Sequence, residues 1–330
     1  KDKSLEERMY WQKVHDGFLG MAVGSAVGVP VDCRSRSYLE ENPVTGMDGY
    51  GTYNLPPGFW SDAVSMSCCL AEALCSGNKR SLIVEKLILW RETGYWTPDG
   101  EVVGVWNTAQ EAVSGLKKRL EGAESCCLDS GEYVFNASLG WVLPLAYVTY
   151  GLSPEQRIKV VTDISSLTNS HVRSNLACIM YNEIALRLLH GIPFDDSVVE
   201  AQEFMLNRFA EEEEMTHFAR IMSGRIVSLR PHEINTSNYI IDTLEACVWT
   251  LLTTSSYKEA VLTAVNLGHD TDTLGAVTGG LAGILYGLEG IPKEWLDKLA
   301  ERGKIEELCE LFSKRMEELD TKRKGRSATV

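Results

Sequence analysis

Apolar residues recur three and four positions apart along most of the chain, the spacing that gathers them on one face of a helix. Residues 65–77 and 81–94 show this spacing clearly. Each of these segments ends at a glycine, Gly77 or Gly94, the residue type that most often follows a helix. The pattern therefore predicts two helices that stop at these glycines.

The same spacing predicts helices in other parts of the chain. Residues 153–167 open with Ser153, Pro154 and Gln156, the arrangement of a capping box at a helix N-terminus. Similar patterns occupy residues 175–191, 242–254 and 291–303. Strand-like alternation is confined to two short stretches, 131–138 and 224–234. We therefore predict an all-α fold in a single compact domain over residues 14–318, with an N-terminal extension (1–13) and a basic, disordered tail (319–330).

Two predicted helices carry glycines at every third or fourth position, which places the glycines on one helix face. They are Gly17, Gly20, Gly24 and Gly28 in the first, and Gly275, Gly279, Gly283 and Gly287 in the second. Glycine in a helix interior costs about 1 kcal/mol relative to alanine, so a stripe of four indicates close approach of another backbone. We expect tight helix–helix packing, and we expect neither segment to be long enough to span a bilayer.

Composition and charge narrow the possible partners. The chain has 330 residues, 44% of them hydrophobic, which is enough for a full core. A formal net charge of −14 makes nucleic acid and anionic membranes poor partners. Nine cysteines without a CxxC pair are typical of free thiols in a reducing compartment, and the first residues do not resemble a signal peptide. We expect a cytoplasmic monomer that binds neither nucleic acid nor membrane.

Two carboxylates stand two residues apart at the start of the second glycine-striped helix. Asp272 or Thr273 could be the N-cap of a helix that begins near Leu274. A cap accounts for one aspartate but not for Asp270 and Asp272 interleaved with threonines. Clustered carboxylate and hydroxyl oxygens suit a hard cation such as Mg²⁺.

Two other motifs with paired acids fit the sequence poorly. An EF-hand loop that began at Asp270 would need an oxygen ligand at its fifth position and glutamate at its twelfth, where this chain has Leu274 and Leu281. A phosphoaspartyl phosphatase would need several strands after the motif, and here helical sequence follows. Further ligands could come from Ser61 and Asp62, which are predicted to form the N-cap and the first turn of a helix. Asp32, which follows the first glycine-striped helix, is another candidate.

Several segments together resemble the ADP-ribosylglycohydrolases, which include ADP-ribosylarginine hydrolases and dinitrogenase-reductase-activating glycohydrolases. The resemblance covers about residues 14–300. The segments are "GFLGMAVGSAVGVPVD", "GFWSDAVSMSCCLAEAL", "FNASLGWVLPLA", "SSLTNSHVRS" and, most specifically, residues 236–287 with "TSNY" and "GHDTDT". The resemblance implies an all-α fold with a central Mg²⁺ cleft. It also implies hydrolysis of the N- or O-glycosidic bond between C1″ of ADP-ribose and an acceptor such as protein arginine.

The resemblance also implies roles for particular residues. One or two Mg²⁺ ions, with Mn²⁺ as an alternative, would be held by Ser61, Asp62, Asp270, Asp272 and Thr273, with Asp62 and Asp272 as the catalytic acids. The implied ADP-ribose contacts are Asp32, Asn136, Ser138, His171, Ser237, Tyr239, Gly268 and His269. In this interpretation the glycine stripes bring two central helices together, and Asp270 and Asp272 lie at the mouth of one.

The chain departs from the family pattern at several positions of the same cleft. The family motif Thr-Asp-Asp-Thr reads Ser61, Asp62, Ala63, Val64 here. The departures elsewhere are Asn169 for histidine, Trp141 for arginine, Gly140 for methionine and Ser25 for aspartate. Loss of a group that only supports a ligand commonly costs about 10–100-fold in metal affinity or activity, and loss of a carboxylate ligand should matter at least as much.

Three hypotheses follow from these departures. The first is a working hydrolase with one weakened metal position. The second is a catalytically silent relative that binds ADP-ribose or serves as a structural, crystallin-like protein. The third is a deliberately disabled variant, in which Ala63 was introduced to trap a ligand; Val64 and Asn169 argue against it, because one change would suffice.

Overall fold

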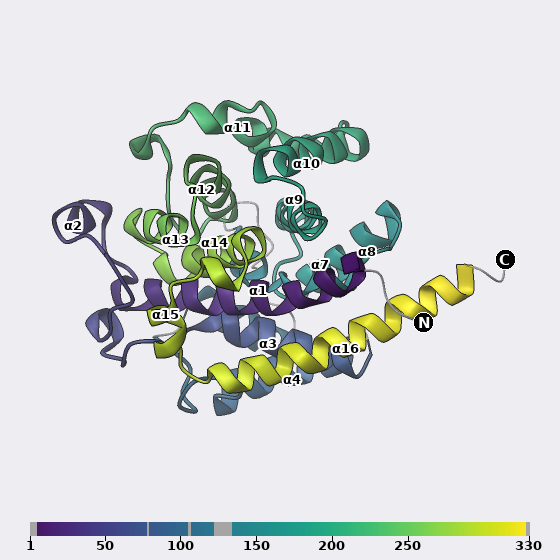
Figure 1. Cartoon of the computed structure of the whole chain (residues 1–330), viewed down its shortest axis with the longest axis horizontal. Helices are drawn as coiled ribbons and strands as arrows, with labels where there is room; N and C mark the ends of the chain where they lie inside the picture. Colours follow the sequence, from purple (N-terminus) through teal and green to yellow (C-terminus); the bar gives the residue numbers. More distant parts are fainter. Residues whose placement is uncertain (1–4, 78, 105–106, 122–133, 328–330) are drawn as a thin grey trace.

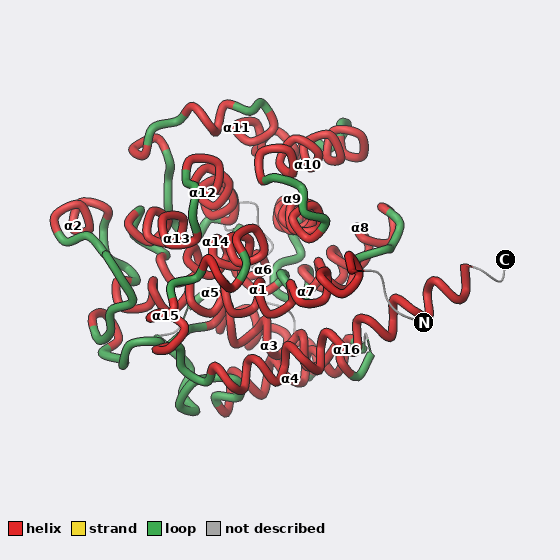
Figure 2. The backbone as a smooth tube through the Cα atoms, in the orientation of Figure 1, coloured by secondary structure: helices red, strands yellow, loops and turns green. Residues whose placement is uncertain are grey.

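The computed structural model describes residues 5–77, 79–104, 107–121 and 134–327. These residues form helices and connecting loops without a named strand (Figure 2), which confirms the predicted all-α fold. The main helices are α1 (Leu5–Gly28), α3 (Asp62–Cys75), α4 (Arg80–Thr93), α5 (Thr108–Leu120), α8 (Pro154–Ser165), α9 (Val172–Leu189), α10 (Phe194–Phe209), α12 (Ile240–Thr253), α13 (Tyr257–Asn266), α14 (Thr271–Tyr286) and α16 (Arg302–Ser327).

Short helices complete the connections between them. These are α2 (Arg36–Glu41), α6 (Ala137–Trp141), α7 (Pro144–Val148), α11 (Ala219–Met222) and α15 (Lys293–Lys298), with 3-10 turns η1 (Val29–Val31), η2 (Gly51–Tyr53), η3 (Glu213–Phe218), η4 (Arg225–Ser228), η5 (Pro231–Glu233) and η6 (Leu288–Gly290). The two segments with strand-like alternation are not strands where they are described: Phe135 makes only an isolated bridge with Tyr239, and residues 225–228 form η4. Residues 131–133 lie outside the described part.

α1 and α14 pack against each other at the centre of the molecule (Figure 1). The helices α3, α4 and α16 cover one side of this pair, and α9, α10, α12 and α13 lie on the other. Because both sides are covered, both central helices are buried along most of their length. Trp11–Val31 is long and apolar enough to cross a membrane, contrary to our expectation, but 83% of its apolar window is buried inside the protein. Its apolar character is therefore accounted for by the core.

The glycine stripes bring the backbones of α1 and α14 into direct contact. A Cβ added at Gly20 would lie 2.5 Å from the carbonyl oxygen of Gly279, and a Cβ at Gly24 would overlap the carbonyl of Gly275. The reverse also holds, since a Cβ at Gly275 would overlap the carbonyl of Gly24. This contact confirms the predicted tight helix–helix packing. At the far end Gly287 ends α14 with a φ of +73°, so it terminates the helix and does not extend the contact.

The helix boundaries agree with several sequence signals and correct others. Gly94 caps α4 in the left-handed region, and Ser153 and Gln156 form the expected capping box. The prediction that Asp272 or Thr273 caps α14 was wrong. The N-cap is Asp270, because the helix already begins at Thr271, whose hydroxyl donates to the carbonyl of Gly28 over 2.7 Å.

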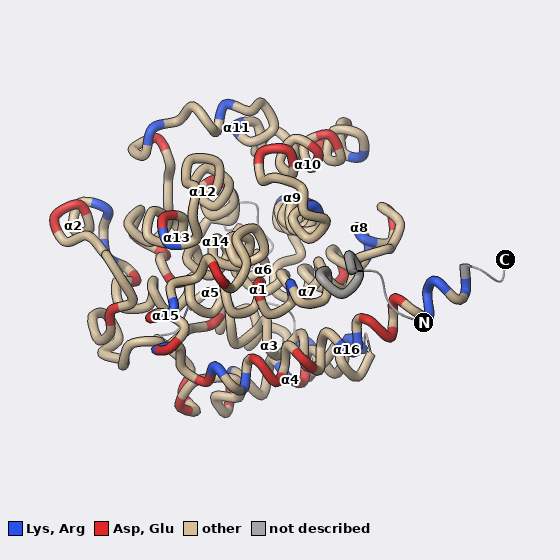
Figure 3. Tube along the Cα trace, in the orientation of Figure 1, with Lys and Arg blue, Asp and Glu red and all other residues tan. Residues whose placement is uncertain are grey.

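The C-terminal helix continues further than expected. We expected a disordered tail from residue 319, but α16 is helical to Ser327 and carries charges of both signs along its length (Figure 3). Arg323 donates from Nη1 to the carbonyls of Val148 and Tyr150, over 3.0 and 3.1 Å, and so ties this end to the loop after α7. Residues 5–13 likewise belong to α1 and are not a separate extension.

The backbone contact makes a direct prediction. Replacing Gly24 by alanine inserts a methyl group into the carbonyl of Gly275, so we expect the free energy of unfolding to fall by about 1–3 kcal/mol. Gly115→Ala in α5 is the matched control: nothing lies within 4 Å of its added Cβ, so removing a helical glycine should stabilise by about 1 kcal/mol. Denaturant unfolding measures both variants. Equal stability changes for the two would contradict the contact.

Candidate functional site

Three carboxylates converge where α1 and α14 meet. Asp32 follows η1 at the end of α1, Asp270 is the N-cap of α14, and Asp272 lies in its first turn. One oxygen from each of the three lies within 4.8 Å of the others. This arrangement follows from the glycine contact, because a Cβ at Gly28 would come within 2.8 Å of the backbone nitrogen of Asp272. The end of α1 is thereby held against the first turn of α14.

Backbone hydrogen bonds lock the two acid-bearing loops together. The amide of Cys33 donates to the carbonyl of His269, and the amide of His269 donates to the carbonyl of Arg34, each over 2.7 Å. Cys33 and His269 both adopt positive φ, 68° and 70°, which is unusual for residues with a side chain. Gly268 is required here, since its φ is +82° and an added Cβ would lie 2.8 Å from the amide of Arg36.

The carboxylates are held close together at an electrostatic cost. Burial and the neighbouring charge of Asp272 raise the pKa of Asp32 to about 8. The same two causes raise the pKa of Asp62 to about 7, and burial with the charges of Asp272 and Asp32 raises the pKa of Asp270 well above its usual range. Burial in a medium of low dielectric constant and nearby like charges both disfavour ionisation of a carboxyl group. A bound cation would offset the repulsion between these carboxylates.

Unpaired oxygens remain among these acids. Asp272 accepts a hydrogen bond from the Ser61 hydroxyl on Oδ2, over 2.7 Å, while its Oδ1 is buried without a partner. Asp62 is bonded to the Asn107 side chain through Oδ2, and its Oδ1 is likewise buried and unpartnered. Buried acceptors without a donor are rare in folded proteins. Carboxylate and hydroxyl oxygens are the ligands that Mg²⁺ and Mn²⁺ prefer, so these residues fit a hard divalent cation.

Ser61 connects the acids to α1. It is the N-cap of α3, yet its hydroxyl makes no capping hydrogen bond, because it is turned toward Asp272. Its backbone amide donates to the hydroxyl of Ser25 over 3.1 Å. Ser25, which stands where the family pattern has aspartate, therefore positions the start of α3 against α1. As an uncharged residue it adds no carboxylate to the cluster.

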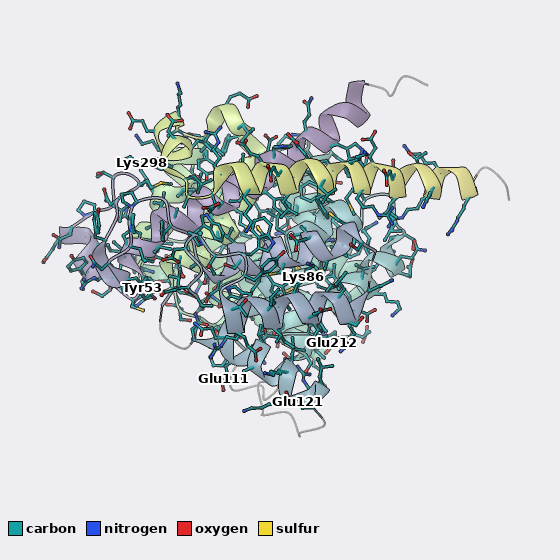
Figure 4. The ribbon with its side chains drawn as sticks, turned by 90° about the horizontal axis from the view of Figure 1, so that it is seen from below. Tyr53, Lys86, Glu111, Glu121, Glu212 and Lys298 are labelled. Carbon is teal, nitrogen blue, oxygen red and sulfur yellow. The ribbon has the colours of Figure 1, made fainter. Side chains whose placement is uncertain are left out.

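The acids lie on one wall of a cavity of about 530 Å³. Its lining residues are Asp32, Cys33, Tyr53, Asp62, Ala63, Met66, Asn107, Thr108, Ala109, Glu111, Asn136, Ala137, Gly140, Ser237, Asn238, His269, Asp270, Asp272 and Thr273. Tyr53 from η2 and Glu111 from α5 are labelled in Figure 4. None of the described lining residues is lysine or arginine, so the cavity is strongly acidic.

The structure brings most of the expected site residues into this cavity, including all four acids together with Thr273. Asn136 donates from Nδ2 to Asp270 over 2.6 Å and to the Thr243 hydroxyl over 2.9 Å, which orients the Asp270 carboxylate. Ser237 and His269 also line it. Ser61 and Gly268 are not among the lining residues. The Ser61 hydroxyl donates a hydrogen bond to Asp272, and Gly268 lets the loop that carries His269 pack closely against its neighbour.

Three other expected contacts lie away from the described lining. Ser138 is fully buried. His171 caps α9, accepting on Nδ1 from the amide of Arg173 over 3.0 Å. The Tyr239 hydroxyl accepts from Nη1 of Arg173 over 3.1 Å. The His171 and Tyr239 side chains thus support the loops around the cavity, whereas Ser138 contributes its backbone amide, which donates to Asn169.

Sequence reasoning did not single out several of the lining residues, among them Asn107, Tyr53 and Cys33. Asn107 is the N-cap of α5 and also bonds to Asp62; an asparagine before a helical pattern was a usable signal for the cap. Tyr53 donates its hydroxyl to Asp32, and Cys33 follows that aspartate directly. No local pattern marks Tyr53, because its contact depends on the path of the loop between α2 and α3.

Two of the departures from the family pattern are built into the core. The Trp141 indole, fully buried, donates to the Thr168 hydroxyl over 2.9 Å. Asn169 accepts from the amide of Ser138 over 3.1 Å. The departures at Ala63 and Gly140 differ in kind: they lie next to each other on the cavity wall, where a Cβ at Gly140 would contact Ala63 at 3.4 Å.

Comparison with known proteins places the chain among relatives with this architecture. The family model described as ADP-ribosylglycohydrolase matches residues 6–322. The chain is 31% identical to the ADP-ribosylarginine hydrolase Tri1 of Serratia proteamaculans (strain 568), over 90% of this chain and 78% of that protein. It is 28% identical to the ADP-ribosyl-[dinitrogen reductase] glycohydrolase of Rhodospirillum rubrum, over 87% of this chain and 91% of that protein.

A solved structure gives the same result. The chain superimposes on a structure titled ADP-ribosylglycohydrolase-related protein complex with a TM-score of 0.70 and 26% sequence identity. The match covers 94% of this chain and 99% of that one. The likeness therefore extends over the whole helical domain and not only over the acidic loops.

The electrostatic cost of the carboxylates predicts a pH-dependent stability. The pKa of Asp32 is raised in the folded state, so folding favours its protonated form, and the free energy of unfolding should fall as pH rises from about 4 toward 8. Asp32→Asn removes this loss. Without metal, we expect the variant to be more stable than the wild type by roughly 1–3 kcal/mol at pH 8, with the difference shrinking toward pH 4.

Thermal unfolding in EDTA at several pH values measures this difference. Added Mg²⁺ should raise the unfolding midpoint of the wild type more than that of Asp32→Asn, because a ligand that binds the native state stabilises it. Parallel pH profiles for the two proteins would show that the carboxylates do not repel each other as described.

Proposed function

The chain belongs to the ADP-ribosylglycohydrolase family, and from that premise we propose that it hydrolyses the glycosidic bond between ADP-ribose and a protein arginine with the help of Mg²⁺ or Mn²⁺. The observation that carries the proposal is the cluster of Asp32, Asp270 and Asp272, with unpartnered oxygen on Asp272, at one wall of a cavity of about 530 Å³. The names of the relatives, an ADP-ribosylarginine hydrolase and an ADP-ribosyl-[dinitrogen reductase] glycohydrolase, support the substrate class.

A divalent cation would be held by Asp32, Asp270 and Asp272, with the Thr273 hydroxyl at the same wall. When bound, such an ion offsets the negative charge of the carboxylates and of the substrate diphosphate, and it polarises an oxygen bound to it. The cavity has no basic lining residue among those described, so an anionic ligand needs this positive charge. Metal binding and nucleotide binding should therefore be strongly linked.

Asp62 is suited to move a proton. Its Oδ2 is fixed by Asn107 and its Oδ1 is unpartnered, on a side chain that lines the cavity. Burial and the charge of Asp272 raise its pKa to about 7. A bound cation would offset the charge of Asp272 but not the burial, which still favours a raised pKa, and a general base works best with a pKa near the operating pH. Cleavage at C1″ builds oxocarbenium character, as in other glycoside hydrolyses, and a carboxylate that accepts a proton from the attacking water assists it.

The second candidate function is that of a catalytically silent relative that keeps ADP-ribose binding or serves as a structural protein. The observation in its favour is Ala63, which lines the cavity beside Asp62 where the family motif has a second aspartate. Alanine offers no oxygen to a metal ion or to a water. The carboxylate cluster itself does not include position 63, so it supports metal binding under either hypothesis.

The first test is metal and activity together. We expect Mg²⁺ or Mn²⁺ titration by calorimetry to show binding to the wild type, and Asp272→Asn to lose most of the affinity, because it removes one charged ligand of the cluster. Hydrolysis of ADP-ribosyl-arginine should require the metal and should be abolished in the same variant. Binding curves that coincide for the two proteins would end the proposed metal site.

The second test restores the missing acid. Ala63→Asp places a carboxylate on the cavity wall next to Gly140, whose lack of a side chain leaves room for it. We expect metal affinity and the hydrolysis rate to rise by roughly tenfold or more. The metal-free variant should be less stable than the wild type, since one more acid joins the cluster.

Ala63→Asn is the matched control for size without charge, and it should leave both quantities close to those of the wild type. If Ala63→Asp folds yet neither binds metal more tightly nor hydrolyses faster, Ala63 is not what limits activity. The silent-relative hypothesis would then lead.

A further inference from the structure

The first turn of α5 forms the wall of the cavity next to Asp62. Asn107 caps this helix, accepting on Oδ1 from the amide of Gln110 over 2.9 Å, and the same side chain donates to Asp62. The amide of Glu111 donates to the carbonyl of Asn107 over 3.0 Å, so Glu111 lies one helical turn beyond it on the same face. Glu111, which is labelled in Figure 4, is exposed to solvent and belongs to the lining of the cavity.

Apolar side chains line the same cavity as Glu111 and the carboxylate cluster. Met66 lies one turn after Asp62 on α3, and Ala63 and Ala109 also belong to the lining. These side chains offer no hydrogen bond. Within the described part of the chain no ion pair engages Glu111, and no lysine or arginine lines the cavity. The cavity lining therefore combines the carboxylate cluster, apolar side chains and one further carboxylate, Glu111, that no ion pair engages among the described residues.

We propose that Glu111 selects a positively charged acceptor by pairing with its guanidinium group while the aliphatic stem of the acceptor lies along Met66 and Ala109. A guanidinium presents parallel N–H donors that match a carboxylate, and its methylene stem gains from apolar contact. The inference rests on the proposed function, because it assigns the leaving-group end of the same cavity. The buried Oδ1 of Asp62 has no hydrogen-bond partner, and Asp62 is held by Asn107, the cap of the helix that carries Glu111, so a ligand is expected beside this helix turn.

The test compares a charged and a neutral acceptor on the full-length, Mg²⁺-loaded protein. Calorimetry measures binding of ADP-ribosyl-arginine and of ADP-ribosyl-serine to the wild type, Glu111→Gln and Glu111→Lys, at a temperature low enough that neither ligand is hydrolysed during the titration. We expect Glu111→Gln to weaken binding of the arginine-linked ligand by roughly three- to tenfold and to leave the serine-linked ligand within about twofold, since a partly exposed ion pair contributes modestly. Glu111→Lys should weaken the arginine-linked ligand further.

Glu121→Gln is the matched control. It makes the same change of charge at the other end of α5, about 15 Å further along the helix axis, and Glu121 does not line the cavity (Figure 4). Binding of both ligands should be unchanged in this variant. The proposal is overturned if Glu111→Gln leaves the arginine-linked ligand unaffected, or if it weakens both ligands equally.

Kinetics separate this proposal from the proposed function. In an active protein, Glu111→Gln should raise KM for ADP-ribosyl-arginine with little change in kcat, because the pairing is made equally before and during cleavage. Hydrolysis by the wild type with KM unaltered in the variant would overturn the role of Glu111 alone. If the wild type binds the arginine-linked ligand selectively but does not hydrolyse it, and Glu111→Gln loses this selectivity, the proposed hydrolysis is overturned and the role of Glu111 is kept. A wild type that binds neither ligand would overturn both.

Discussion

The direct backbone contact between α1 and α14 is the constraint on which the rest of the structure depends. At Gly20, Gly24 and Gly28 the facing backbone of α14 occupies the space that a side chain would need. Hydrogen bonds from other elements reinforce the pair, for example from the Tyr257 hydroxyl to the carbonyl of Gly20 over 2.6 Å. The contact fixes the relative height of the two helices, and so it fixes where the loop after α1 meets the first turn of α14.

The fixed position of α1 relative to α14 brings the acids together, and this proximity lowers the free energy of unfolding. Asp32 and Asp272 are both buried, and each disfavours ionisation of its neighbours. Positive φ at Cys33 and His269 adds backbone strain beside them. A core that is packed on both sides of α1 and α14 supplies the stability that offsets this cost. The arrangement is preorganised for a ligand that would relieve the repulsion between the acids.

The sequence predicted the parts of this arrangement that depend on local spacing. Glycines at steps of three and four identified the central contact, and two aspartates flanked by threonines identified the candidate metal-binding loop. The cap of α14 was misplaced by two or three residues, because the helix begins already at Thr271, whose hydroxyl bonds to Gly28, a contact between residues 243 positions apart. The roles of Asn107, Tyr53 and Glu111 likewise depend on how distant loops meet, and no periodicity in the chain records that.

The hydrogen bonds of Trp141 and Asn169 have a consequence for how this sequence can change. The Trp141 indole is buried against Thr168, and Asn169 holds the amide of Ser138, so the loop before α9 and the short helix α6 now fit each other. Returning Trp141 to arginine alone would bury an unpaired charge, and returning Asn169 to histidine alone would release a buried amide. Neighbouring residues that share partners do not contribute additively. Single substitutions at Trp141 or Asn169 are therefore expected to be costly, whereas Ala63 lines the cavity next to Gly140 and can be exchanged without breaking a side-chain hydrogen bond.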